Sequence, residues 1–373
     1  MGTVAIIGGG AGGAAAARLL RRQLGSEHRV VLIEQEPAVL RQEALPRLAV
    51  GLRSRQDLVR NINRLAQEGL QVVVDRVLRV DCTNRRIYTE NRAVQYDLVI
   101  IAAGAGLKPG HPPGTAEAGY NVLTAGGAAG ILARIKNFQG EEVAILASPS
   151  PLTKYPAAPY EYALLLENWF RMQGRGKDLS ITIITPEPVP LQRYGSRAAE
   201  AVAELLLKRN IRVHPNTTVQ QVDLEKKLIQ PAHGGSFLFD LLLYCPESAP
   251  PPLLRESGLA DETGWLPVDR HTLLAKQEGV LGLGDATRIT THDGAVLPQM
   301  GAAARGQARV AAGNAARLLN GKAPEPAYRG KAAWFLDAGR GALLFTGGFY
   351  QAPADFRPHP AGALLHPLQA LWQ

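Results

Sequence analysis

The residues best suited to chemistry begin with a glycine-rich turn near the N-terminus. Gly8, Gly10 and Gly13 follow the apolar run Val4 to Ile7 and open an alanine-rich segment. Gly8 permits a tight turn, Gly10 lets the backbone approach a pyrophosphate, and Gly13 lets a helix pack closely on a strand. The phosphates would lie at the positive end of that helix, near Ala11. This spacing predicts a dinucleotide-binding turn.

A carboxylate follows at the position where a bound ribose needs one. The apolar run RVVLIE ends at Glu34, about twenty residues after the glycines, where an acidic side chain accepts hydrogen bonds from a ribose 2′-hydroxyl. The alternative is a glycine-rich turn without a ligand. These two features by themselves do not separate FAD from NAD.

Two later segments decide between the two cofactors. YDLVIIAAGA, residues 96–105, predicts a second buried strand that ends in small residues, and GVLGLGDAT, residues 279–287, predicts a third. In this order the segments resemble the fingerprint of flavoproteins with two dinucleotide-binding domains. The resemblance implies FAD, with Asp285 on the ribityl chain; an ordinary helix N-cap is the alternative for Asp285. The contacts expected from these segments are Ala103, Gly104, Gly284 and Asp285.

Strands and helices must alternate along the chain to position these residues, which implies parallel sheets covered by helices. We expect an α/β protein with two Rossmann-like, three-layer domains. The FAD domain is discontinuous, 1–110 and 270–325, and a second, NAD-type domain spans 111–269. Residues 326–373 predict a short antiparallel hairpin or interface segment. The stretch 44–74 fits a loop, an amphipathic helix and a strand.

Residues 141–170 resemble a second nucleotide-binding unit that lacks its glycines. An apolar strand, Val143 to Leu146, and a long helix from Pro159 are present, but the turn between them reads ASPSPLTKYPAAPYE. Pro149 and Pro151 remove two backbone N–H donors there. Such donors hold the pyrophosphate of NADH in relatives, so a nicotinamide would need an unusual site.

Several longer stretches narrow the family. YPAAPYEYALLLENWFR, ITIITPEPVP, FDLLLYCPESAPPPLL and LPQMGAAARGQARVAAGNAARLL resemble the sulfide:quinone oxidoreductases and the flavoprotein subunits of flavocytochrome c sulfide dehydrogenases. The resemblance runs from residue 1 to about 350. It implies a redox-active cysteine pair beside the flavin, at or near Tyr155 and Ala333. Neither position is cysteine, and Cys82 and Cys245 occupy neither family position.

The missing cysteines change the expected chemistry. Sulfide oxidation in these families needs a disulfide that a sulfur nucleophile attacks and a thiolate that then attacks the flavin. This chain lacks that pair, and RQEALPR contains no cysteine to anchor the flavin covalently. We expect noncovalent FAD and no brisk sulfide oxidation.

Three residues of the rebuilt turn are the catalytic candidates. Lys154 could hold an anionic substrate or stabilise reduced flavin, Tyr155 could stack or donate a hydrogen bond, and Glu161 begins a helix. Their ordinary alternatives are an exposed lysine, loop packing and a helix-start residue. In relatives the helix after Gln299 and Met300 points at the pyrimidine end of the flavin, which implies the same role for their backbone N–H groups. We predict no metal site.

Composition and charge limit the partners. The net charge is +8, but the basic residues are spread along the chain, so nucleic acid is not expected. Weak attraction to an anionic membrane surface or substrate stays open. With two cysteines and no apolar run of about 18 residues, the chain suits the cytoplasm, with a peripheral place on the inner membrane face as the alternative.

The chain closes with GALLHPLQALWQ, whose apolar face is interrupted by Pro367. It could touch a membrane, or pack on its own domain or on a partner in a homodimer. Leu364, Leu365, Leu368, Leu371 and Trp372 would form this face.

Three functions therefore stay open. The first is an FAD-dependent oxidoreductase resembling sulfide:quinone reductase, which passes electrons from an unidentified small-molecule donor to quinone or another acceptor. The second is an NAD(P)H-dependent flavin reductase or dehydrogenase with an atypical nicotinamide site. The third is a non-catalytic protein that binds FAD for structure or sensing.

Overall fold

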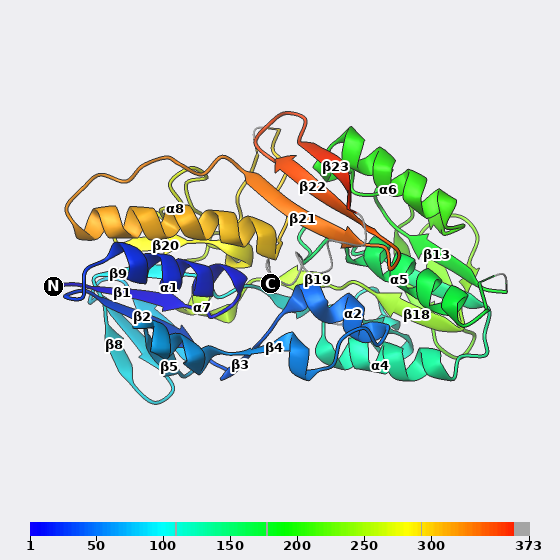
Figure 1. Cartoon of the computed structure of the whole chain (residues 1–373), viewed down its shortest axis with the longest axis horizontal. Helices are drawn as coiled ribbons and strands as arrows, with labels where there is room; N and C mark the ends of the chain where they lie inside the picture. Colours follow the sequence, from blue (N-terminus) through cyan, green and yellow to red (C-terminus); the bar gives the residue numbers. More distant parts are fainter. Residues whose placement is uncertain (109, 177, 292, 362–373) are drawn as a thin grey trace. The chain divides into compact units, whose positions relative to one another are not determined.

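The computed structural model describes residues 1–108, 110–176, 178–291 and 293–361 (Figure 1). The chain divides into two compact units, each built from three segments. Unit 1 comprises residues 1–41, 59–106 and 249–332; unit 2 comprises residues 42–58, 107–248 and the chain from 333 onward.

A five-stranded parallel sheet forms the centre of unit 1. Its order is β20 (Val280–Gly282), β9 (Leu98–Ile101), β1 (Thr3–Ile7), β2 (Arg29–Glu34) and β5 (Gln71–Val74). The central strands are apolar and almost wholly buried, as strands covered on both faces must be. Helices α1 (Ala11–Gln23) and α8 (Gly301–Leu319) pack against each other and on this sheet (Figure 1).

The other face of this sheet is covered by a small antiparallel sheet of β6 (Val77–Asp81), β7 (Arg86–Thr89) and β8 (Ala93–Gln95). Val80 and Ile87 of that sheet share a core with Ile7 and Ile33 of the parallel sheet. Unit 1 thus has the predicted three layers. Its remaining elements are β3 (Ala38–Leu40), β4 (Val59–Asn61), α7 (Pro252–Glu256) and the 3-10 helices Ile62–Glu68 and Gly284–Ala286.

Unit 2 repeats this arrangement. Its parallel sheet has the order β11 (Tyr120–Asn121), β18 (Leu241–Tyr244), β12 (Glu142–Leu146), β13 (Ser180–Ile184) and β14 (Arg212–His214). One face packs on the antiparallel sheet β15 (Val219–Asp223), β16 (Leu228–Pro231) and β17 (Phe237–Leu238), with Val222 and Ile229 in the shared core. Its helices are α2 (Leu45–Ala49), α3 (Thr115–Ala118), α4 (Ala125–Lys136), α5 (Ala158–Met172) and α6 (Ser196–Lys208), with 3-10 helices at Gln42–Ala44, Gln56–Leu58 and Gln192–Tyr194.

The two remaining strands, β10 (Gly106–Lys108) and β19 (Glu247–Ala249), lie where the chain passes from one unit to the other. The parallel sheets with covering layers in both units confirm the predicted α/β class.

The C-terminal segment contains one strand more than the predicted hairpin. β21 (Lys331–Asp337), β22 (Ala342–Gly348) and β23 (Asp355–Ala361) form a three-stranded sheet in which β22 and β23 are antiparallel. The third strand reads DFRPHPA, and its prolines argue against a strand in the sequence. They are tolerated because β23 is an edge strand.

The stretch 44–74 also differs from its prediction. The amphipathic helix expected there is a seven-residue 3-10 helix, Ile62–Glu68, capped by the Asn61 side chain and ended by Gly69 in the left-handed region at φ 80°. The short α2 and the 3-10 helix Gln56–Leu58 precede it, so this stretch contains three brief helices instead of one long helix.

The two units differ from the predicted domain boundaries, and three of the differences are large. Residues 42–58 and the C-terminal sheet belong to unit 2, and residues 249–269 belong to unit 1. Among the described residues, no helix has both the length and the apolar character to cross a membrane. The apolar face proposed for Leu364 to Trp372 lies outside the described residues.

Candidate cofactor site and candidate active site

The glycine turn of unit 1 has the close contacts that its sequence predicts. Gly8 has φ +103°, and its N–H donates to the Ile33 carbonyl at 2.8 Å. A Cβ at Gly13 would lie 1.9 Å from the Gly8 carbonyl oxygen, so only glycine lets α1 approach the turn this closely. The turn is therefore held against β2 and α1 by backbone contacts.

Gly10 differs from its neighbours because it faces open space. A Cβ added there would meet no atom within 4 Å. Gly10 is the N-cap of α1, and no side chain caps the first turn, which begins at Ala11. Uncapped N–H groups at a helix start, beside empty space, form a suitable cradle for a phosphate.

Glu34 lies beside this turn. Its carboxylate accepts hydrogen bonds from the backbone N–H groups of Gly9, at 2.6 Å, and Glu36, at 3.3 Å. A cavity of about 400 Å³ is bounded by Gly8, Glu34 and Ala103, together with Asp75 and Arg76. Three predicted cofactor contacts thus line one cavity, large enough for part of a dinucleotide. Gly104 follows, and a Cβ there would also meet no atom within 4 Å.

A second group of predicted contacts comes together at the start of α8. Gly284, Asp285, Gln299 and Met300 line one small cavity of about 10 Å³. The Gln299 side chain, 4% exposed, donates from Nε2 to the Asp285 carbonyl at 3.0 Å, while its Oε1 has no partner among the described residues. Met300 is the N-cap of α8, again without a side-chain cap.

These observations fit FAD in unit 1. An open cradle at Gly10, a cavity at Glu34 and a buried, unpartnered acceptor at Gln299 are what a bound dinucleotide would complete. Gly284 is fixed by a residue that the sequence did not indicate, because its N–H donates to the buried Gln307 Oε1 at 2.6 Å. Gln307 lies two helical turns into α8, and nothing in the sequence distinguishes it from the other residues of that helix.

The rebuilt turn of unit 2 makes its own hydrogen bonds. The Ser150 N–H donates to Ser148 Oγ at 3.3 Å, and the Leu152 N–H donates to Ser150 Oγ at 3.1 Å. Helix α5 begins after Ala157 with no side-chain cap and with a proline in its first turn. The turn thus offers fewer free N–H groups than a glycine turn would.

The acidic residue after β13 is also occupied. Tyr160, which is fully buried, donates its hydroxyl to Glu187 Oε2 at 2.6 Å, and the Leu191 N–H donates to the same oxygen at 3.3 Å. Burial raises the pKa of the Glu187 carboxyl. One oxygen of this carboxyl is therefore already bound by two of the protein's own groups.

A cavity of about 280 Å³ remains in unit 2 beside the rebuilt turn. Its wall includes Tyr155, Glu187, Arg193 and the buried Cys245. The volume is near the lower end of ligand pockets, roughly 300–1,000 Å³. Burial lowers the pKa of Arg193, whose guanidinium donates to the Pro151 carbonyl at 3.1 Å.

Tyr155 and Glu161, both predicted as catalytic, contact each other. The Tyr155 hydroxyl donates to Glu161 Oε2, and the Glu161 side chain is 4% exposed. Burial, and then the negative charge of Asp337, raise the pKa of Glu161 well above its usual range, although Arg47 opposes this. Lys154 precedes Tyr155, is half-buried, and is not among the described residues that line the cavity.

Arg47 and Asp337 are site residues that the sequence did not reveal. Arg47 donates from Nε to Asp337 Oδ2 at 2.7 Å, and both side chains are almost fully buried. They come from α2 and from the end of β21, 290 positions apart. An arginine in LPR and an aspartate in a turn gave no local signal of this pairing.

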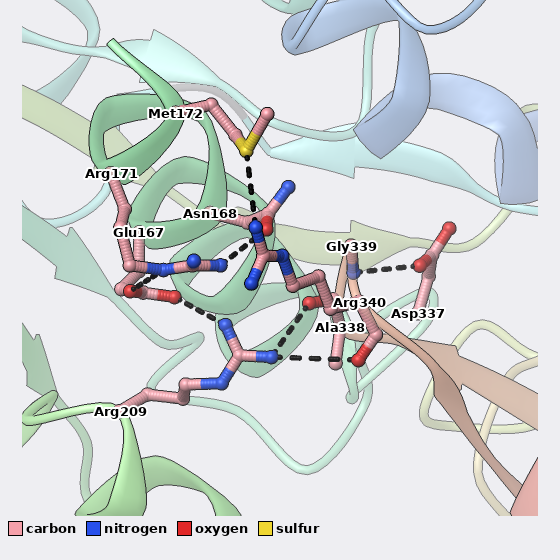
Figure 2. A network of polar contacts seen from close by, with 9 residues as sticks. All are labelled: Glu167, Asn168, Arg171, Met172, Arg209, Asp337, Ala338, Gly339 and Arg340. Atoms are coloured by element: carbon pink, nitrogen blue, oxygen red, sulfur yellow. Dashed lines mark hydrogen bonds and ion pairs between the residues drawn. The ribbon is translucent and has the colours of Figure 1, made fainter. Parts of the chain in front are cut away.

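The turn that carries Asp337 is fixed by a polar network (Figure 2). The Gly339 N–H donates to Asp337 Oδ1 at 2.9 Å, within the β21–β22 turn. Arg209, at the end of α6, donates to Glu167 Oε2 at 2.6 Å and to the Ala338 carbonyl at 3.4 Å. Arg171 holds the other oxygen of Glu167 at 2.9 Å. Helices α5 and α6 thereby hold this turn in place.

Both cysteines are free thiols in hydrophobic or partly buried surroundings. Burial raises the pKa of Cys245, on the wall of the unit 2 cavity, and the pKa of Cys82 in unit 1. A raised pKa disfavours the thiolate, which is the reactive form.

The sequence matches the pyridine nucleotide-disulphide oxidoreductase family over residues 2–146 and 160–308. The stretch between the two matches, 147–159, contains the rebuilt turn. The chain is 25% identical over 308 residues to the mitochondrial sulfide:quinone oxidoreductase of Mus musculus, which covers 77% of this chain and 66% of that protein. It is 23% identical over 221 residues to the sulfide-quinone reductase of Aquifex aeolicus, which covers 58% and 51%.

The match therefore spans less than two thirds of the length of these curated relatives. Among solved structures, the sulfide:quinone oxidoreductase from Aquifex aeolicus superposes with a TM-score of 0.89 at 20% identity, over 100% of this chain and 90% of that chain. At that identity the likeness shows the shared fold. Together these matches confirm the predicted superfamily, the oxidoreductase class and FAD as the cofactor. The chain belongs to the pyridine nucleotide-disulphide oxidoreductase family.

Proposed function

We propose that this protein is an FAD-dependent oxidoreductase similar to the sulfide:quinone oxidoreductases that works without a cysteine pair. Electrons from a small-molecule donor pass through noncovalent FAD to a quinone or another acceptor. The observation that carries this proposal is the pairing of an intact FAD turn in unit 1 with Tyr155 and Ala333 at or near the two expected cysteine positions.

The two cysteines present do not supply a substitute relay. Cys245 is 4% exposed, and both thiols have raised pKa values, so neither forms a ready thiolate at neutral pH. They also belong to different units of the chain, Cys82 to unit 1 and Cys245 to unit 2. We therefore propose that electrons reach the flavin by a reaction other than attack of the donor on a disulfide.

Nicotinamide is disfavoured as the donor. The position for an NADH pyrophosphate has lost its glycines, and its N–H groups are replaced by prolines or engaged by Ser148 and Ser150. The carboxyl of Glu187, which follows β13, is occupied by Tyr160. A nicotinamide dinucleotide would have to displace these internal contacts.

FAD, when bound, supplies the two-electron chemistry. The chain's own residues would hold it: the turn at Gly8 and Gly10 would receive the pyrophosphate, Glu34 would accept from the ribose, and Asp285 would bind the ribityl chain. The backbone N–H groups after Gln299 and Met300, at the positive end of α8, stabilise negative charge at the far end of the cofactor.

Stopped-flow absorbance of the FAD-loaded protein tests this proposal. The protein is mixed separately with NADH, NADPH and sulfide, and chemically reduced protein is mixed with a soluble quinone. We expect slow or no bleaching by the three donors and rapid return of the oxidised spectrum with quinone. Rapid bleaching by a nicotinamide would instead support the reductase alternative, and inertness toward every donor and quinone would support a non-catalytic flavoprotein.

A further inference from the structure

We infer that the cavity of about 280 Å³ in unit 2 binds a small zwitterion, with an α-amino acid as the ligand class. The Arg193 guanidinium binds the carboxylate of this ligand, and the Glu187 carboxyl binds its ammonium group. The inference goes beyond the proposed function, because it uses neither the flavin nor the electron acceptor. The residues that line the cavity lie between 147 and 245, within unit 2.

Two side chains of opposite charge line this cavity without pairing with each other. Glu187 follows β13, and Arg193 lies in the 3-10 helix Gln192–Tyr194. Burial raises the pKa of Glu187 and lowers that of Arg193, and the charge of each opposes the shift of the other. No ion pair joins the two in the described part of the chain. A ligand that carries both charges would compensate each of these half-buried groups.

Both side chains keep hydrogen-bonding capacity for a ligand. Glu187 accepts from Tyr160 and from the Leu191 N–H through Oε2, and no described residue donates to its Oε1. Arg193 donates from Nη1 to the Pro151 carbonyl at 3.1 Å, and its other two nitrogens have no acceptor among the described residues. Two neighbouring nitrogens of a planar guanidinium match the two oxygens of a carboxylate.

Two serine hydroxyls add donors to the wall of the cavity. Ser148 Oγ accepts from the Ser150 N–H at 3.3 Å, and Ser150 Oγ accepts from the Leu152 N–H at 3.1 Å. A hydroxyl that accepts a hydrogen bond can still donate its own proton, and neither O–H has an acceptor in the part of the chain that the structure describes. Together with Arg193, these serines therefore offer several donors to a carboxylate.

The backbone around the two charged groups has an uncommon conformation. Leu191 and Tyr155 have φ values of 56° and 50°, in the left-handed region that bulky side chains rarely adopt. The Leu191 N–H donates to Glu187 Oε2, and Leu191 directly precedes the 3-10 helix that carries Arg193. The conformation of Leu191 thus determines where both charged groups lie. Backbone strain of this kind is concentrated at functional sites, which supports a ligand site here.

Prolines make the rest of the cavity wall rigid. A proline ring fixes φ, so little conformational entropy remains to be lost when a ligand binds. The rebuilt turn therefore replaces the N–H donors of a glycine turn with a rigid wall that carries hydroxyl donors. The prolines that line the cavity are Pro149, Pro151, Pro156, Pro159, Pro186 and Pro188.

Charge and size together select the ligand class. Glu187 and Arg193 are the charged residues among the described ones that line the cavity, and one charge of each sign matches a zwitterion. A phosphate group would instead bring up to two negative charges near the Glu187 carboxyl. The volume of about 280 Å³ is just below the roughly 300–1,000 Å³ of most ligand pockets, which suits a small molecule rather than a dinucleotide.

Thermal unfolding of the FAD-loaded protein with each of the protein amino acids in turn tests the inference. At least one of them should raise the melting temperature, because a ligand of the folded state stabilises it. Isothermal titration calorimetry then compares that amino acid with its deaminated acid and its decarboxylated amine; for alanine these are propionate and ethylamine. Each analogue loses one charged contact and should bind at least about 10-fold more weakly. If no amino acid raises the melting temperature, or if either analogue binds as tightly, the inference is overturned.

Variants assign the two ends of the ligand. Arg193→Gln should weaken binding of the amino acid and of the deaminated acid by roughly 10-fold or more. Glu187→Gln keeps an acceptor for Tyr160 and should weaken binding of the amino acid alone. The control Arg197→Gln, at an exposed position on α6 outside the cavity wall, should bind like the wild type. Unchanged affinity in both cavity variants would contradict the inference, and if a variant does not fold, the analogues decide with the wild type.

These measurements need neither an electron donor nor a quinone, so failure of the proposed function would leave their outcome unaffected. NADH is the contrasting probe. Stabilisation by NADH and by no amino acid would assign the cavity to a dinucleotide and overturn the inference.

Discussion

Two glycines of the same turn, Gly10 and Gly13, have different roles, and single substitutions can distinguish these roles. A Cβ at Gly13 would lie 1.9 Å from the Gly8 carbonyl oxygen, whereas a Cβ at Gly10 would meet nothing within 4 Å. Gly13 therefore serves the packing of α1, and Gly10 serves the ligand. These are the two roles that the sequence motif predicts for these glycines.

We predict that Gly10→Val gives a folded protein that does not retain FAD. A Cβ at this position meets no atom within 4 Å, so the valine side chain would occupy the open cradle for the pyrophosphate. Absorbance near 450 nm, roughly where any oxidised flavin absorbs, should be lost after purification, while the circular dichroism spectrum is kept. Gly313→Val, also facing open space but on α8, should keep its flavin. Gly13→Val should fail to fold.

Cys245 provides a second test at the residue scale. It is buried, its pKa is raised, and we assign it to packing beside the unit 2 cavity. Cys245→Ala should leave flavin reduction and reoxidation rates within about twofold and lower the free energy of unfolding by roughly 1 kcal/mol, because a buried sulfur is lost. A large fall in rate, with flavin content unchanged, would make this thiol catalytic.

At the scale of elements, the β21–β22 turn carries Asp337 and is held by α5 and α6 (Figure 2). Arg209 is the link between the helices and the turn, with its ion-paired side chain only 17% exposed. Arg209→Met should lower the free energy of unfolding by roughly 1–3 kcal/mol, since it leaves buried acceptors unpaired. Denaturant unfolding measures this loss.

The neighbouring pair gives the control. Lys208 contacts Glu204 with both side chains about two-thirds exposed, at 67% and 65%. Lys208→Met should leave the free energy of unfolding nearly unchanged, because an exposed ion pair contributes little. Equal effects of the two substitutions would show that the network does not hold the turn.

Asp337 and Glu161 should act as alternative partners of Arg47. In Asp337→Asn, the negative charge that raises the pKa of Glu161 is gone, so Glu161 should ionise and pair with Arg47. The wild type should lose stability as pH rises, because buried Glu161 keeps its proton in the folded state, and this loss should be smaller in Asp337→Asn. The double variant Asp337→Asn, Glu161→Gln leaves Arg47 without either carboxylate and should lose on the order of 3–5 kcal/mol. If the double variant loses only the sum of two small effects, the two carboxyls are independent.

The elements that the sequence predicted well are those with a strong local pattern. β1, β2, β9 and β20 are short apolar runs next to glycines, and α1 follows its glycine turn directly. β23 was missed because prolines in an edge strand imitate a loop, and the helix at Ile62–Glu68 is shorter than its pattern because Gly69 ends it. Local sequence propensity is enough to predict the first group of elements. The structure of the second group depends on where its residues lie in the tertiary structure.

The residues of the candidate site also differ in how far the sequence could predict them. The cofactor contacts follow a motif whose spacing has a mechanical reason, so the sequence could place them in one unit and near two cavities. The polar contacts that link Arg47 to Tyr155 join residues up to 290 positions apart. Glu161 was predicted as a catalytic candidate at a helix start, and only the structure reveals its burial beside Asp337.

For the whole molecule, two units with the same layered plan have different prospects for ligand binding. Unit 1 keeps the open turn of a dinucleotide site and a Gln299 oxygen that has no partner in the described part of the chain. In unit 2, the N–H donors of the corresponding turn and the carboxyl after β13 are absent or hydrogen-bonded within the protein. A smaller cavity lined by Tyr155 and Arg193 is present there. This asymmetry underlies the proposal of one FAD and no nicotinamide dinucleotide.

The central claim is that this flavoprotein works without the dithiol relay of its relatives, and sulfide-dependent quinone reduction tests it most directly. The purified, FAD-loaded protein is supplied with sulfide and a soluble quinone, and turnover is followed by the loss of quinone absorbance. With Tyr155 and Ala333 at or near the cysteine positions, we predict turnover below about 1 per second, the lower end of typical enzyme rates. Sustained turnover well above that rate would contradict the claim, because it would require a sulfur relay that this chain is proposed to lack.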